Sequence, residues 1–307
     1  MVIFLTLPEG RGHVQNFLRR NGHSFSRVIA ETTYGELLDR GVAPRAAYVF
    51  GDCQRMNDAQ RDLAARIWDR LTAVDGLRLL NSPRRQLGRY GLLRALYDKG
   101  INDFNVYRLD ELGPHMRFPV FVRIENDHGG ARSELLYDLD QVRMAASRLL
   151  LSGFRRENIL VVEFLNVQDS RGRYIKFGAF RIGDTIFGHH AMMATHWETK
   201  MSAAIRDEEG IRLTDTYYQQ NPHVELLRPL FELAAVDYGR IDYAVVDGRI
   251  QVWEINDNPM FASARMMRIT RLPKHLTYIE GCQALAAGLQ TGPPIPLDID
   301  LKPAGVA

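Results

Sequence analysis

The sequence predicts an α+β protein that begins with a small α/β unit. Apolar runs of strand length, such as Val2–Leu7 and Ala46–Phe50, alternate with helical patterns over the first 83 residues. Between residues 172 and 255 the pattern changes to two hairpins, each built around a turn of Gly and Asp. A change from alternating units to consecutive strands is typical of α+β chains.

Composition excludes several classes of protein. Hydrophobic residues make up 46% and charged residues 25% of the 307 positions, which are values of a folded chain rather than a disordered one. The formal net charge is only +2, so bulk electrostatics favours neither nucleic acid nor a membrane surface. We therefore expect no nucleic-acid partner and no membrane partner.

The cysteines and the start of the chain indicate the compartment. Cys53 and Cys282 are far apart and build neither a disulfide framework nor a metal knuckle, which favours a reducing environment. The apolar start, Met1–Pro8, lacks a basic leader and indicates a buried first strand. No run approaches the roughly 20 apolar residues of a membrane helix. We expect a soluble, cytoplasmic protein.

The first expected unit covers residues 1–83. Its last helix, Ala59–Ala73, has the clearest pattern, because Leu63, Ile67 and Leu71 recur every four residues on one face. A turn signal, Asn-Ser-Pro at 81–83, marks the boundary. The other elements expected here are helices near Val14–Arg20 and Tyr34–Arg40 and a strand near Ser26–Ala30.

A linking helix and a second unit are expected over residues 84–165. Leu92, Leu93 and Leu96 supply the apolar face of the helix, and Gly100 ends it. A strand is predicted at Phe118–Ile124, before a polar glycine loop that extends to residue 131. The later elements are a helix over about Leu139–Ser152 and a strand at Ile159–Leu165.

The third expected unit covers residues 166–290, and residues 291–307 form a proline-rich tail. A long helix is predicted over His223–Tyr238 and a final helix near Lys274–Leu289. The two predicted hairpins pair Arg173–Arg181 with Thr185–His189, and Ile241–Val246 with Arg249–Ile255.

The second hairpin carries a candidate metal site. Glu254 and Asn256 are two residues apart on one strand, so their side chains leave by the same face. Asp242 lies on the preceding strand. Two carboxylates and an amide oxygen suit Mg²⁺, which also takes substrate phosphates and water as ligands. An edge hairpin with exposed acids is the alternative interpretation.

Whether Asp242 faces Glu254 depends on the turn between the strands. Their separation is even (254 − 242 = 12), so direct pairing requires a loop with an odd number of residues centred on Gly248. A two-residue Asp-Gly turn would put the carboxylates on opposite faces. With the odd loop, an apolar floor forms on the metal face from Ala244, Val246, Ile250 and Val252.

The segment from Arg240 to Pro259 resembles the C-terminal metal signature of the ATP-grasp superfamily. That superfamily includes D-alanine–D-alanine ligase, glutathione synthetase and the peptide-tail glutamate ligases. The resemblance implies two α+β lobes that sandwich ATP, with a small α/β domain in front. It also implies that one or two Mg²⁺ ions, or Mn²⁺ in their place, bind to Asp242, Glu254 and Asn256. Arg240 would stabilise the transferring phosphoryl group.

Other segments resemble the nucleotide site of the same superfamily. Arg89 and Arg123 stand where these enzymes usually have ATP-contacting lysines, and an arginine keeps the charge and can bind phosphate. The loop with His128, Gly129 and Gly130 resembles the flap over the phosphates. The remaining implied nucleotide contacts are the adenine hinge Glu163, Phe164 and Leu165 and a ribose-binding acid, Asp169.

The segment after residue 172 resembles a branch of the superfamily without an assigned substrate. Lys176 would contact phosphate and act in catalysis, while His190 and Trp197 would line the acceptor side. Asn258 completes the metal signature and is a further candidate for substrate contact. The alternative for the histidines is a structural role in a partly buried position, which their irregular spacing favours over a metal site.

The resemblance implies an enzyme that joins a small carboxylate or peptide to an amine. ATP would convert the acid to an acylphosphate, and the flap would exclude the water that hydrolyses it. A homodimer through the N-terminal domain is a further expectation. The alternatives are an ATP-binding pseudoenzyme, motivated by the two arginines, and a kinase that stops after phosphoryl transfer.

Overall fold

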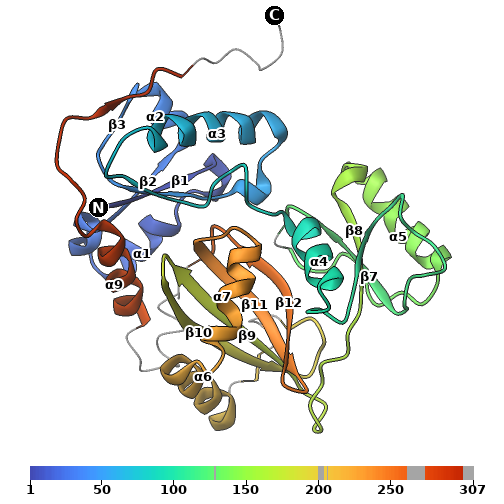
Figure 1. Ribbon diagram of the computed structural model, residues 1–307. Helices are drawn as coiled ribbons and strands as arrows, with labels where there is room; N and C mark the ends of the chain where they lie inside the picture. The colour runs from blue at the N-terminus through green and yellow to red at the C-terminus, as the bar shows by residue number, and fades with distance from the viewer. Residues whose placement is uncertain (128, 200–203, 206, 261–273, 300–307) are drawn as a thin grey trace, which may run out of the picture.

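The computed structural model describes residues 1–127, 129–199, 204–205, 207–260 and 274–299. Figure 1 shows three groups of elements. A sheet with α2 and α3 lies at the top left, a group with β7, β8 and α5 lies at the right, and a larger sheet with α6 and α7 lies below. Together these mixed layers make an α+β chain, as the sequence predicts.

The first sheet is parallel and has the strand order β2-β1-β4-β5. Its central strand β1 is buried at every position, which explains its unbroken apolar sequence. The strands are β1 (Val2–Thr6), β2 (Ile29–Thr33), β4 (Ala47–Phe50) and β5 (Arg78–Leu80).

Three helices connect these strands. α2 and α3 each begin with a capping box, in which Thr33 bonds with Glu36 and Asn57 bonds with Gln60. The helices are α1 (His13–Asn21), α2 (Tyr34–Asp39) and α3 (Asp58–Thr72). Short 3₁₀ turns lie at Pro8–Gly10, His23–Arg27, Cys53–Arg55 and Arg156–Asn158.

The strand predicted near Ser26–Ala30 is wrong in its position. A 3₁₀ helix occupies His23–Arg27, and β2 starts only at Ile29, where pairing with β1 begins. A further pair was not predicted. β3 (Val42–Ala43) pairs with β13 (Ile295–Pro296), so the proline-rich tail returns to the first group of elements.

The second sheet is small and antiparallel, with the order β6-β8-β7. β6 was not predicted, because three residues are too few to show a period. The linking helix α4 ends before Gly100, whose φ of 65° is typical of a residue that follows a helix. The elements are α4 (Arg89–Asp98), β6 (Val106–Arg108), β7 (Val120–Ile124), α5 (Leu139–Leu151) and β8 (Ile159–Glu163).

The third sheet has the order β10-β9-β11-β12 and is antiparallel throughout. The helix predicted over His223–Tyr238 is too long, because β11 already begins at Tyr238, and α6 was not predicted. The elements are β9 (Tyr174–Ile182), β10 (Thr185–Ala194), α6 (Glu208–Gln220), α7 (Val224–Leu233), β11 (Tyr238–Val246) and β12 (Arg249–Asn256).

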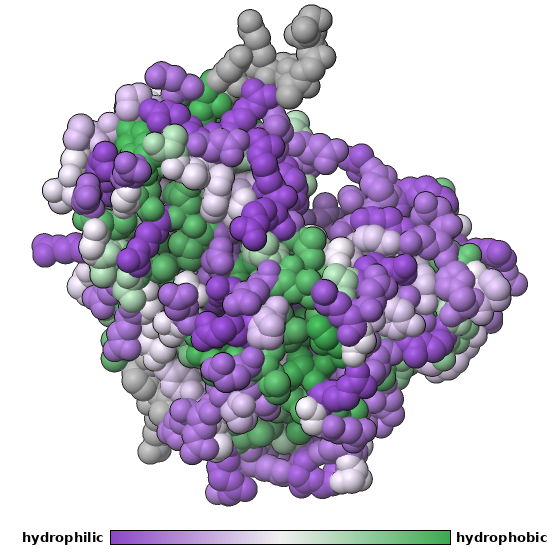
Figure 2. Space-filling model, viewed as in Figure 1, coloured by the Kyte–Doolittle hydropathy of each residue, from purple (hydrophilic) through white to green (hydrophobic). Residues whose placement is uncertain are grey.

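The two large sheets share a core through the last helix, α9 (Lys274–Ala286). α9 contacts both β1 and β9, and its Tyr278 and Cys282 are buried in one cluster with Phe4 and Phe180. Figure 1 shows α9 beside α1 at the edge of the first group. Figure 2 shows the molecule from the same side as Figure 1. Hydrophobic residues gather in the middle of this view, while hydrophilic residues cover most of its rim.

Candidate active site

A β-bulge places the two predicted metal carboxylates opposite each other. Asp247 and Gly248 form a two-residue turn in which both φ angles are positive, as a tight hairpin turn requires. Because Asp242 and Glu254 are an even number of residues apart, this turn alone would put their side chains on opposite faces of the hairpin. However, the register shifts beyond Asp242, and Trp253 is the extra residue on β12. Asp242 and Glu254 are therefore cross-strand partners.

The bulge corrects two sequence-based expectations. The odd-numbered loop is wrong, because the extra residue lies inside β12 and not in the turn. The apolar floor is wrong as well. On the Asp242 face, Ala244 pairs with Gln251, and Val246 pairs with Arg249. Ile250 and Val252 instead pair with Val245 and Tyr243 and belong to the core on the opposite face.

Asp242 lies in an ion-pair cluster with two cations. Arg240 Nε donates to Asp242 Oδ1 at 2.8 Å, and Lys176 Nζ donates to Oδ2 at 3.3 Å. Lys176 lies two residues before Gly178, the residue of β9 that pairs with Asp242, so all three side chains share one face of the sheet. Asp242 itself is buried. The structure therefore brings the two predicted catalytic cations to the same carboxylate.

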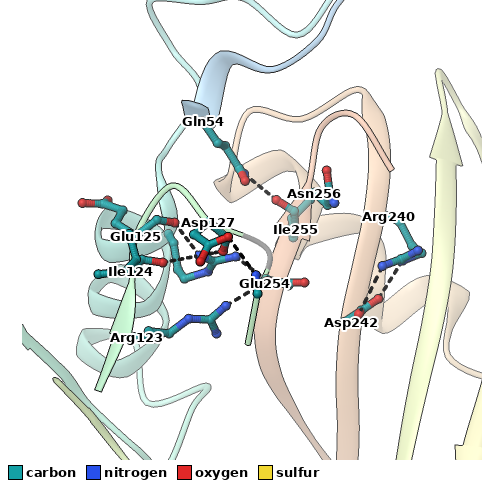
Figure 3. Close-up of polar contacts among 12 residues, drawn as sticks. Gln54, Arg123, Ile124, Glu125, Asp127, Arg240, Asp242, Glu254, Ile255 and Asn256 are labelled. Carbon is teal, nitrogen blue, oxygen red and sulfur yellow. Dashed lines mark hydrogen bonds and ion pairs between the residues drawn. The ribbon is translucent and has the colours of Figure 1, made fainter. Parts of the chain in front are cut away.

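Glu254 is held from the other side by the two arginines at the predicted lysine positions. Arg89 Nη2 donates to Glu254 Oε2, and Arg123 Nη2 lies 3.3 Å from the same oxygen. Figure 3 shows Glu254 beside Arg123 and Asp127, while Asp242 pairs with Arg240 on the neighbouring strand. Burial, and then the positive charge of Arg89, lower the pKa of Arg123 to about 10.

Arg89 also holds the root of the glycine loop. Its Nη1 group donates to the backbone carbonyls of Ile124, Glu125 and Asp127. Only 2% of Arg89 is exposed, at the first position of α4. A guanidinium has five donors in a fixed fork, whereas a lysine ammonium has three on one nitrogen. The arginine therefore connects three carbonyls of the loop to a carboxylate of β12.

The predicted flap is anchored at both of its ends. Within the described part of the loop, Gly129 N donates to Asp127 Oδ1 at 2.9 Å, and Gly130 has a φ of 86°. Ala131 N donates to Glu198 Oε1 at 2.8 Å, which connects the loop to the segment after β10. The predicted phosphate contact His128 lies outside the described residues.

The end of β12 meets the first sheet. Asn256 is buried, and its Oδ1 accepts the backbone N–H of Asn258 at 2.9 Å. Asn258 then bonds to Gly10 O at 3.1 Å, to Asp52 Oδ1 at 3.0 Å and to His13 Nδ1 at 3.1 Å. The predicted substrate residue Asn258 therefore lies at the turn after β1, at the carboxyl ends of the parallel strands.

Asp257 is a buried acid that sequence reasoning missed. Its Oδ2 accepts Gln86 Nε2 at 2.9 Å. Burial, followed by the nearby charge of Asp52, raises the pKa of Asp257 to about 6. The signal was visible in the Asn-Asp-Asn run at 256–258, where alternation puts Asp257 on the opposite side of the strand from its neighbours.

The predicted hinge is organised by the side chain of Glu163. This buried carboxylate accepts hydrogen bonds from Tyr107 Oη at 2.8 Å and from Arg117 Nε at 3.0 Å. Burial alone would raise the pKa of Glu163, but these bonds lower it. Phe164 N donates to Pro119 O at 2.9 Å. The side chain of Glu163 therefore joins β8 to β6 and to the loop before β7, and Tyr107 and Arg117 had no local sequence signal.

Trp197 packs beside the predicted hinge. Its ring packs against Phe121 of β7 at a centroid distance of 5.1 Å and against Phe164 of the hinge at 5.8 Å. The indole thus lies next to the predicted adenine hinge, and its role on the acceptor side stays a prediction. Leu165 packs against the same core.

His190 occupies space that a missing side chain leaves open. His190 pairs with Gly178, which in turn pairs with Asp242, so His190 lies in one row with the two carboxylates. A Cβ on Gly178 would come within 2.3 Å of His190 Cε1. His190 Nδ1 also bonds to His189 Nδ1 at 2.8 Å. The ring is thus a buried histidine on the Asp242 face of the sheet.

Asp169 forms ion pairs and caps its own turn. Its Oδ1 accepts the backbone N–H groups of Arg171 and Arg173, and its Oδ2 accepts Arg173 Nε at 2.9 Å. The bonds with Arg173 come first among the causes that lower the pKa of Asp169 to about 2. The predicted ribose role of Asp169 would compete with this ion pair.

The donor set on β11 and β12 fits Mg²⁺. Asp242 and Glu254 supply two carboxylates on adjacent strands, and Asn256 supplies an amide oxygen that has a second lone pair. Mg²⁺ needs only one or two protein carboxylates when phosphates and water complete its shell. Within the described residues, no group of three or more His, Cys, Asp or Glu side chains is placed to hold a metal by itself.

The sheet order and the likeness to solved structures identify the fold of the chain. The chain has the ATP-grasp fold, with two α+β units behind a small parallel sheet. No protein-family model matches the sequence, and no curated protein sequence does.

Solved ATP-grasp structures share this fold over most of the chain. D-alanine–D-alanine ligase from Bacillus anthracis superposes with a TM-score of 0.53 at 16% identity, covering 92% of this chain and 97% of the other. The corresponding ligase from Coxiella burnetii gives 0.53 at 11% identity, over 92% and 95%. The ATP-grasp ligase PsnB, complexed with a precursor variant, Mg and ADP, gives 0.50 at 14% identity, over 92% and 96%. At these identities the likeness shows the fold.

The helices that the structure describes include no candidate membrane span. Each of these helices is too short or too polar to cross a bilayer.

Proposed function

We propose that the chain is an ATP- and Mg²⁺-dependent ligase that joins a carboxylic acid to an amine through an acylphosphate. The observation that carries this proposal is the pairing of Asp242 with Glu254 across the bulge, within reach of four cationic side chains. The ATP-grasp ligases with the same fold support it, and they include structures complexed with ATP or with Mg and ADP.

The proposed reaction has two steps. A carboxylate oxygen of the substrate attacks the γ-phosphorus of ATP, and ADP leaves. The amine nitrogen then attacks the acyl carbon, and phosphate leaves with the electron pair of the broken C–O bond. Arg240 and Lys176 would neutralise charge at the phosphoryl group, since both already lie on the Asp242 face. Mg²⁺, when bound, supplies further positive charge against the phosphate oxygens.

Several parts of the chain would place the substrates. The described part of the loop at 126–131 lies against Arg89 and Glu198, so it can cover the phosphates and exclude water. The hinge at 163–165 would receive adenine, with Trp197 beside it. The turn after β1 and Asn258 would face the carboxylate or peptide substrate.

The test replaces one predicted metal ligand. Glu254→Gln should lower Mg²⁺-dependent ADP release, measured with a screen of carboxylic acids and amines, by about 100-fold or more. The matched control is Glu208→Gln, because Glu208 is an exposed acid on α6 that pairs with Arg212. Full activity of the Glu254 variant would contradict the assignment. A stable phosphorylated product without condensation would indicate a kinase instead.

A specific observation also favours a second function, an ATP-binding pseudoenzyme. Arg89 and Arg123 replace the lysines that the resemblance implies, and both pair with Glu254. A pseudoenzyme would bind ATP in calorimetry but would release no ADP across the whole acceptor screen. The ligase proposal requires release with at least one pair of substrates.

A further inference from the structure

Both predicted metal-binding carboxylates form ion pairs with cationic side chains of the protein. Glu254 contacts Arg89 and Arg123, and Asp242 contacts Arg240 and Lys176. Both arginines contact Glu254 Oε2, so a divalent cation that takes this oxygen must displace guanidinium groups. Displacement is costly when the arginine stays buried without another anion, because a buried charge needs a partner.

The charge of this cluster favours a particular ligand. Four cations and two carboxylates give a net charge of +2 over the six side chains. A free divalent cation would raise that charge to +4 in a partly buried place, which is unfavourable. A nucleoside triphosphate with one divalent cation has a charge of about −2, and it would neutralise the cluster.

Arg89 and Arg123 also have unused donors. Their Nε–H groups are buried and bond to no described residue, while only 2% of Arg89 and 8% of Arg123 is exposed. A buried donor without a partner costs free energy until a ligand supplies an acceptor. Phosphate oxygens are acceptors of the required charge and geometry, so the arginines gain bonds when they turn from Glu254 to phosphate.

We propose that Arg89 and Arg123 form a clamp on Glu254 that opens only when nucleotide phosphates replace the carboxylate as their partner. The divalent cation therefore enters the site together with the nucleotide and does not bind stably before it. This inference rests on the proposed nucleotide site. It assigns Arg89 a role that lysine would not reproduce, because the Arg89 guanidinium bonds to Glu254 and to the carbonyls at the root of the flap at once.

The test measures metal binding without catalysis. Mn²⁺ is titrated into the full chain and the free ion is followed by electron paramagnetic resonance, first alone and then with a non-hydrolysable ATP analogue. In the unsubstituted protein, Mn²⁺ should bind weakly alone and about 5- to 150-fold more tightly with the analogue. Arg123→Gln should raise the affinity for Mn²⁺ alone by a similar factor, because it removes one competitor for Glu254.

Two further variants complete the experiment. Arg123→Lys keeps the charge but loses the fork, so its affinity for Mn²⁺ alone should rise less than that of Arg123→Gln. If Arg123→Gln does not fold, the proposal still requires that Arg123→Lys binds Mn²⁺ alone more tightly than the unsubstituted protein does. The matched control is Arg181→Lys. Arg181 is also 8% exposed and bonds to Gly183 O and Val236 O, away from Glu254. Its Mn²⁺ affinity should not change.

The outcomes separate this inference from the proposed function. If the analogue binds but the Arg123 variants leave the affinity for Mn²⁺ alone unchanged, the clamp is overturned while the nucleotide site stands. If the unsubstituted protein binds Mn²⁺ alone as tightly as with the analogue, the clamp is again overturned. If no analogue binds under any condition, the proposed function fails, and the clamp fails with it.

Discussion

Single residues in this chain acquire their chemistry from partners that are distant in sequence. Asp257 is an example, because Gln86 is its hydrogen-bond partner and Asp52 is the nearby charge that raises its pKa further. Glu254 is another, because its partners are Arg89 and Arg123 of the second unit. In both cases burial makes the partner decisive, since an isolated buried charge is strongly unfavourable.

The raised pKa of Asp257 predicts a pH dependence of stability. The group takes up a proton more readily in the folded protein, where its pKa is about 6, than in the unfolded chain, where it is near 3.8. Its contribution is therefore fully present below pH 3.8 and is lost as the pH rises through about 6. The difference corresponds to about 3 kcal/mol at most.

Asp257→Asn tests this dependence. The amide carries no charge, so the variant should gain thermal stability relative to the unsubstituted protein at pH 8 and gain much less at pH 5. The measurement is the Tm of both proteins at the two pH values. If the Tm of the variant differs from that of the unsubstituted protein by the same amount at pH 5 and at pH 8, Asp257 is ionised to the same extent in the folded and the unfolded protein.

At the scale of elements, the third sheet shows how backbone irregularities position side chains. The bulge at Trp253 shifts the register of the hairpin by one residue, so that Asp242 and Glu254 lie opposite each other. At the opposite edge of the sheet, a second register shift in β10 accompanies the close approach of His190 to Gly178. Glycine is required at 178 because the histidine ring occupies the space of its Cβ.

Two glycine variants test this packing. Gly178→Ala should lower the free energy of unfolding by about 1–3 kcal/mol, because its Cβ would overlap His190. Gly91→Ala in α4 should raise it by about 0.5–1 kcal/mol, because the nearest atom lies at 3.7 Å and alanine favours a helix. Urea denaturation of both variants measures the difference. Equal effects of one sign would show that the space at Gly178 is not limiting.

At the scale of the whole molecule, the end of the chain joins parts that the sequence places in different units. α9 lies between β1 and β9, and its Tyr278 bonds to Tyr238 of β11 at 3.0 Å. The tail then adds β13 to β3. The first group of elements thus buries one face of its sheet with a helix that comes almost 200 residues after β5 (274 − 80 = 194).

This sharing predicts joint destabilisation. Tyr278→Ala removes a buried ring and should cost about 3–5 kcal/mol, whereas Tyr278→Phe removes only a hydroxyl group and should cost about 1 kcal/mol. Hydrogen exchange measures the effect locally. In Tyr278→Ala, exchange should become faster in β1 and in β9 together. Faster exchange in only one of these strands would show that α9 belongs to a single unit.

The sequence by itself determined the order of the main elements, the α+β class and the segment that carries the two acids and the amide. Apolar periods and turn residues are local signals, so they can be read along the chain. The short strands β3, β6 and β13 gave no such signal because they have only two or three residues.

Only the tertiary structure decided how the site is assembled. The bulge at Trp253, the two arginines on Glu254, the position of Trp197 on the hinge and the sharing of α9 all depend on contacts between distant segments. A hairpin register depends on packing over both faces, and an arginine binds whichever carboxylate the fold brings to it. Such choices are made by burial and charge pairing in three dimensions, which a local pattern does not contain.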